Sequence, residues 1–174
     1  MAAIPAPEQA DSLAGVLAAI RAERAAADRA ECRVLELAVD WAAMHEWSDP
    51  LGPESLVAVG GSGTPEVGEF CVAELAAALR ISTDAGRSLL AEAVELAHRL
   101  PQTWRRVRAG DLPAWRARRV ACSTLVLTPE GARYVDRHVA PFAHRVGPAQ
   151  LDRLVEEALV RFEPDLADAR RRAA

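Results

Sequence analysis

Residues 74–90 read ELAAALRISTDAGRSLL, and this stretch sets the architecture that we expect for the chain. It resembles a helix-turn-helix, with a first helix up to Leu79, a short turn around Ile81 and Ser82, and then a second helix. Ala76 is a small residue at the place where two such helices would cross. The outward face of the second helix, which presents side chains to base edges in this motif, would carry Thr83, Asp84, Arg87 and Ser88. The pattern makes Thr83, Arg87 and Ser88 candidate DNA-binding residues.

Two positions in this stretch depart from the motif. Arg80 stands in the turn, at a place that usually needs glycine for a left-handed backbone. Gly86 stands where a β-branched residue normally packs. An ordinary corner between two helices is therefore the alternative interpretation.

The segment before this pair predicts one long helix. From about Glu8 to Trp47 there is no Pro and one Gly, and apolar residues recur in steps of three and four, the period of a coiled coil. The stripe, which only Glu23 interrupts, consists of Leu13, Val16, Ile20, Ala27, Ala30, Val34, Leu37, Trp41 and Met44. A helix of about 40 residues is about 60 Å long, too long for one small core, so it must bend, break or pair. The stripe either faces the core or forms a seam, for example in a homodimer through residues 13–44.

The remaining chain predicts an all-α fold, a multi-helix bundle with a helix-turn-helix-like pair. We expect a flexible N-terminus at 1–7, the long helix at 8–47 and a Pro- and Gly-rich loop at 48–68, in which Leu56–Val59 could form a short strand. Residues 69–174 show helical periods and caps without strand alternation, and form the expected helical core.

Composition and charge narrow the possible partners. The chain has 174 residues, 51% of them hydrophobic and 26% charged, which excludes wholesale disorder. It contains no Lys and no Asn, so Arg supplies every fixed side-chain cation. The net charge is −4, but it is unevenly distributed. Residues 80–119 hold nine Arg and four acidic residues, whereas residues 1–79 hold four Arg and 13 acidic residues. A basic middle in an acidic protein points to an anionic partner.

Most of this basic charge lies in residues 99–121, RLPQTWRRVRAGDLPAWRARRVA, with seven Arg, one acidic residue, and Trp104 and Trp115 interleaved. Arg forms bidentate contacts with phosphates, and Trp stacks on bases. The candidate phosphate contacts are Arg105, Arg106, Arg108, Arg116, Arg118 and Arg119, of which Arg116 and Arg119 would share a helix face. The alternative is a solvated face whose Arg pair with acids of the N-terminal half, such as Glu23, Glu31 and Glu36.

No catalytic, metal-binding or membrane pattern is visible in the sequence. The four His and three Cys are scattered, and the Gly-rich stretch at 60–63 has no Lys after it, so it is no phosphate loop. We therefore expect no enzyme activity, cofactor, metal or small-molecule substrate. The start lacks a basic and apolar leader, and no apolar run approaches the roughly 18 residues of a membrane span, so we expect a cytoplasmic protein without membrane contact.

Four stretches resemble one known family. They are similar to the domain of unknown function 222, the thirteen-E-twelve repeat family of actinobacteria. The four stretches are GTPEVGEF at 63–70, RLP at 99–101, G-x-x-P-A-W-R-A-R-R at 110–119 and the run from LTPEGAR at 127 to EEAL at 159. The resemblance spans about residues 30–170. Its members are typically larger, and many carry a C-terminal HNH nuclease domain, which implies work on DNA.

An HNH nuclease needs a His base, metal ligands and usually an Asn that orients the base. This chain has no Asn and no Cys-x-x-Cys, so we expect it to correspond to the N-terminal helical part of such proteins, cut short at its C-terminus. The expected function is a non-catalytic DNA-binding or targeting module of an HNH-endonuclease-associated protein. The alternative is a protein-interaction or dimerisation scaffold with internally paired Arg.

Overall fold

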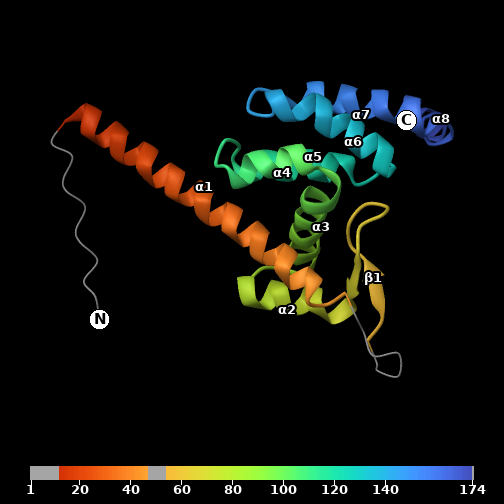
Figure 1. Cartoon of the computed structure of the whole chain (residues 1–174), viewed down its shortest axis with the longest axis horizontal. Coiled ribbons are helices and arrows are strands. Elements are labelled where there is room, and N and C mark those ends of the chain that lie inside the picture. The colour runs from red at the N-terminus through yellow and green to blue at the C-terminus, as the bar shows by residue number, and fades with distance from the viewer. Residues whose placement is uncertain (1–11, 47–53, 174) are drawn as a thin grey trace.

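The structure is a computed structural model that describes residues 12–46 and 54–173. The flexible N-terminus expected at 1–7 lies outside the described residues. The elements are α1 (Leu13–Ala43), β1 (Leu56–Ala58), β2 (Glu66–Gly68), α2 (Glu69–Leu79), α3 (Thr83–Arg99), α4 (Pro101–Arg108), α5 (Ala114–Thr124), α6 (Pro129–Val139), the 3-10 turn η1 (Ala140–Phe142), α7 (Pro148–Phe162) and α8 (Pro164–Ala173). In Figure 1, α2 and the strands lie at one end, α6 to α8 lie at the other, and α3 connects the two. The all-α prediction is confirmed.

Helix α3 is the centre of the core. Ser82 caps it by accepting a hydrogen bond from the Ala85 N–H at 3.2 Å. Every residue from 89 to 96 is buried, because α1, α2 and α5 all pack against this helix. The first two turns of α3 and His98 in its last turn are open to solvent, and the residues between them make the helix a core element.

The predicted turn between α2 and α3 is present, and both departures from the motif have a physical reason. Arg80 adopts the left-handed conformation itself, with φ 56° and ψ 41°. Gly86 lies at the crossing of the two helices, where an added Cβ would be 2.7 Å from the Cβ of Ala76. The helices approach so closely that a β-branched residue would not fit at position 86.

The α1 stripe faces the core only at Val34 and Trp41, which are partly buried and pack against it. None of the nine stripe residues is fully buried, and Leu13 and Met44 are 87% and 78% exposed. The residues that α1 buries are Leu35, Ala38 and Ala42, on a neighbouring face whose small side chains allow a close approach to α3. Helix α1 runs unbroken from 13 to 43, and its N-terminal half extends away from the other helices (Figure 1).

A small hairpin forms in the described part of the predicted loop, residues 54–68, whereas residues 48–53 of that loop lie outside the described residues. Strands β1 and β2 pair antiparallel, with Val57 opposite Val67. The Gly61 N–H, between the strands, donates to Glu95 Oε2 of α3 at 3.3 Å. A Cβ on Gly61 would lie 1.4 Å from Arg99 Nη1, so only glycine fits where the hairpin meets the core.

Glu95 and Arg99 form the centre of a buried polar network. Arg99 Nη1 lies 2.9 Å from Glu95 Oε2, and its Nη2 donates to the Leu127 carbonyl. The Thr124 hydroxyl donates to Glu95 Oε1 at 2.7 Å. Burial raises the pKa of the Glu95 carboxyl, against the hydrogen bond from Thr124 and the charge of Arg99. The network connects the hairpin, α3, α5 and the start of α6. Arg99, the first Arg of the basic run, is therefore bound within the protein.

Candidate nucleic-acid interface

Three further Arg of the basic run are held by the protein itself. Arg106 Nη1 donates to the Ala140 carbonyl and so joins α4 to η1. Arg108 Nε lies 3.1 Å from Glu36 Oε1 of α1, and Arg118 Nε lies 2.5 Å from Glu92 Oε2 of α3. These contacts are of the internal kind that the sequence left open, and they fix α4 and α5 against the core.

The other predicted phosphate contacts, Arg105, Arg116 and Arg119, have no carboxylate partner in the described part of the chain. The Arg116 guanidinium lies over the ring of Trp115, with its carbon 4.7 Å from the ring centre. Trp115 is 46% exposed, whereas Trp104 is partly buried and packs against the core. Only one of the two interleaved Trp is therefore available on the surface.

Arg116 and Arg119 share a face of α5, as the spacing predicts, and they line one hollow with Trp115. The hollow has a volume of about 180 Å³ and lies between α5 and the start of α7, where Arg145 and Gly147 complete it. Its described lining contains three Arg and no carboxylate. An uncompensated cluster of this kind attracts an anion, because nothing in the hollow itself neutralises it.

A second, more open hollow adjoins the first across Trp115. Its lining comprises Glu92, Trp115, Arg118, Arg119, Cys122 and Ser123. Trp115 and Arg119 contribute to both hollows, so the indole forms part of the wall on two sides. Arg118 contributes little free charge here, because Glu92 neutralises it.

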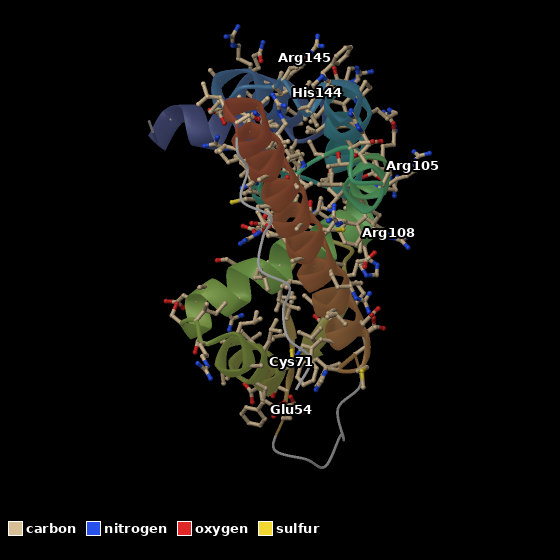
Figure 2. The ribbon with its side chains drawn as sticks, turned by 90° about the vertical axis from the view of Figure 1, so that its left-hand side faces the viewer. Glu54, Cys71, Arg105, Arg108, His144 and Arg145 are labelled. Atoms are coloured by element: carbon tan, nitrogen blue, oxygen red, sulfur yellow. The ribbon has the colours of Figure 1, made fainter. Side chains whose placement is uncertain are left out.

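Arg145 belongs to a basic segment that the sequence reasoning missed. Residues 137–151 contain two Arg and two His but no acidic residue, and this absence was a signal that could have identified the segment. Figure 2 shows His144 and Arg145 at one end of the molecule, with Arg105 and Arg108 on the flank nearest to them and Cys71 and Glu54 at the opposite end. The fold thus brings two acid-poor segments together.

The candidate DNA-binding residues of the helix-turn-helix-like pair lie outside the two hollows. Thr83, Arg87 and Ser88 are exposed at the start of α3, as the motif predicts. Thr83 lies nine positions before Glu92, the residue that anchors α5 through Arg118, whereas Ser88 lies one turn before it. None of the three residues lines either hollow beside Trp115.

Other site types find no support in the described ranges. Residues 12–46 and 54–173 contain no group of three His, Cys, Asp or Glu that could hold a metal ion. Burial raises the pKa of the Cys71 thiol to about 11, which suppresses the reactive thiolate form at neutral pH. Among these same residues, no helix is both long and apolar enough to cross a membrane.

A comparison with models of known protein families identifies one match. Residues 55–174 match the domain of unknown function (DUF222). Comparisons with curated proteins and with solved structures found no match. The matched region runs from the hairpin to α8 and includes Trp115, Arg116, Arg119 and Arg145, whereas α1 precedes it. Since this region makes up well over half of the sequence, the chain belongs to the family defined by this domain of unknown function.

Proposed function

We propose that the chain is a non-catalytic DNA-binding module, and that its binding surface is formed by α5 and the segment before α7. The observation that carries the proposal is the hollow beside Trp115, where Arg116, Arg119 and Arg145 converge without a carboxylate among its described lining residues. Guanidinium groups match the geometry of phosphate oxygens, and an exposed indole beside them suits a base or a sugar.

The distribution of charge around the hollow also supports DNA as the ligand. The protein as a whole is acidic, with a net charge of −4, so a polyanion would be repelled by most of its surface. The acid-poor segments at 112–129 and 137–151 meet at the hollow and leave a local region of positive charge. This contrast would direct a nucleic acid to one end of the molecule.

The Arg of the basic run and Arg145 then divide by role. Arg116, Arg119 and Arg145 contact phosphates, and Arg105 extends the surface along α4. Arg106, Arg108 and Arg118 orient α4 and α5 through their contacts with the core. The exposed start of α3, with Thr83, Arg87 and Ser88, provides a second contact with DNA that lies apart from the first.

A DNA titration tests this proposal. Labelled DNA, both as a duplex and as its separated strand, is titrated at about 50 and 200 mM salt and followed by fluorescence anisotropy. Arg116→Ala with Arg119→Ala should weaken binding and lower the salt slope by about two, one for each phosphate contact removed. The control, Arg21→Ala with Arg133→Ala, removes two exposed charges from α1 and α6 and should bind like the wild type. Absence of binding at low salt, or equal binding by the two double variants, contradicts the proposal.

The non-catalytic part of the proposal has its own test. The resemblance to HNH-associated proteins supports a role in which this module holds DNA for a nuclease domain. Incubation of the purified chain with plasmid DNA and Mg²⁺ or Mn²⁺ should give no cleavage, and cleavage that copurifies with the chain would show that it is an enzyme.

A second candidate function, self-association through α1, is favoured by a different observation. Leu13, Val16 and Ile20 of the coiled-coil stripe are all exposed in the half of α1 that extends away from the other helices (Figure 1). Sedimentation over a range of concentrations should show a dimer that Leu13→Glu with Ile20→Glu converts to a monomer. A wild-type monomer at all concentrations would eliminate this candidate.

A further inference from the structure

Resting on the proposed DNA-binding function, we infer that the site beside Trp115 binds single-stranded DNA rather than intact duplex. Trp115 stacks on an unpaired base, while Arg116, Arg119 and Arg145 hold the phosphates next to that base. Trp115 is the residue that determines the preference for single strands.

The position of the Trp115 ring suits stacking. The indole is 46% exposed at the start of α5, and it separates the two hollows. Its neighbours Ala114 and Ala117 are 1% and 0% exposed, so the backbone that carries the ring is fixed in the core. Only the two side-chain torsions of the indole remain to be ordered when a base stacks on it, so the loss of conformational entropy is small.

The cations are placed next to this ring. Arg116 covers one face of the indole, and Arg119 lines both adjoining hollows, so a base stacked on the other face has a guanidinium close to its phosphate. A positively charged groove combined with an aromatic stacking face is the arrangement by which proteins bind single strands without reading sequence.

An intact duplex cannot use this arrangement. Its bases are stacked on both faces by their neighbours, and a protein that reads them inserts a protruding helix or strand into a groove about 12 Å wide. Here the site is a hollow of about 180 Å³ rather than a protrusion, and Trp115 lies in its wall. Only a nucleotide with a free base face gains the stacking contact.

The experiment compares strand and duplex. A labelled oligonucleotide and its duplex are titrated with the wild type, Trp115→Ala, Trp115→Phe and, as a control, Phe142→Ala, which removes an aromatic ring 61% exposed outside this hollow. The wild type should bind the strand more tightly. Trp115→Ala should weaken strand binding by about 5- to 150-fold, the measured range for loss of one stacked base, and leave duplex binding unchanged. Trp115→Phe should retain most of the strand affinity, and Phe142→Ala all of it.

The outcomes separate this inference from the proposed function. If duplex binds as tightly as the strand, or if Trp115→Ala weakens both equally, the single-strand preference is overturned and DNA binding stands. If neither form binds, the proposed function itself fails. Quenching of tryptophan fluorescence by the strand provides a second readout, which should be reduced in Trp115→Phe and unchanged in Phe142→Ala.

Discussion

Arg99 and the cluster of Arg116, Arg119 and Arg145 show two uses of the same side chain. Arg99 is 4% exposed, and its guanidinium bonds to Glu95 and to the Leu127 carbonyl. The three cluster residues converge on a hollow without a carboxylate among its described lining. One site is internally neutralised, and the other leaves its charge to an outside partner.

The difference follows from access to water. A buried charge must find its counter-charge within the protein, because no solvent is there to stabilise it, whereas an exposed charge needs none. The number of Arg in a sequence run therefore overstates a binding surface. Of the seven here, Arg99 is structural, three hold helices together, and Arg105, Arg116 and Arg119 remain open.

The largest effect should come from the interior site. Arg99→Ala leaves Glu95 buried without its cation, and we expect the free energy of unfolding to fall by about 3–5 kcal/mol. Urea denaturation followed by circular dichroism measures the loss. A loss as small as that of an exposed Arg would remove the distinction between the two sites.

A smaller loss is expected from the hairpin side of the same network. Gly61→Ala places a Cβ 1.4 Å from Arg99 Nη1 and 2.8 Å from Glu95 Oε2, so the hairpin must move away, at a cost of about 1–3 kcal/mol. Gly147→Ala is the matched control, because the nearest atom to its Cβ is 3.8 Å away. Equal thermal midpoints for the two variants would show that the hairpin does not depend on this contact.

The ion pairs of Glu36, at the edge of the core, should have an effect on stability between those of the two sites. The hydrogen bond from Arg33, and then that from Arg108, hold the pKa of Glu36 below its ordinary value. The unfolded chain therefore binds this proton more tightly, so the pair stabilises the fold above the unfolded pKa and loses that effect as the pH falls through the folded pKa. Glu36→Gln should cost up to about 1 kcal/mol at neutral pH and nothing in acid. Urea unfolding of both proteins across this range measures the difference, and a difference that does not change with pH would argue against the pair.

The smallest change in stability should come from substitutions in the cluster of Arg116, Arg119 and Arg145. Arg116→Ala with Arg119→Ala removes no described ion pair, so we expect the free energy of unfolding to stay within about 0.5 kcal/mol of the wild type. Thermal melting measures this alongside the DNA titration. A large loss of stability would mean that these two Arg, like Arg99, serve the fold.

Local signals in the sequence predicted the helices well. Ser82 and Thr128 cap helices through their side chains, and Gly110 has the positive φ of 78° that ends α4. Each of these features depends on a few neighbouring residues. The left-handed Arg80 likewise occurs at the turn position that the motif marks.

Features that depend on distant packing were not predicted. The α1 face that packs on α3 is set by Ala38 and Ala42, which a search for large apolar residues does not favour over Leu37. The ends of the Arg99 network come from Gly61 and Leu127, far apart in sequence. Arg145 enters the site only because α7 begins beside α5.

The uncovered half of α1 has a consequence for local folding. Isolated helices shorter than about 12–15 residues are marginal in water, and residues 13–27 have few supports beyond the Ser12 cap and the Arg24–Asp28 ion pair at 2.6 Å. Amide protons there should exchange with solvent much faster than those near Leu35, which the core protects. We therefore expect the local stability of α1 to rise from its exposed outer end to its buried inner end, and a partner that covers the outer end should slow amide exchange there.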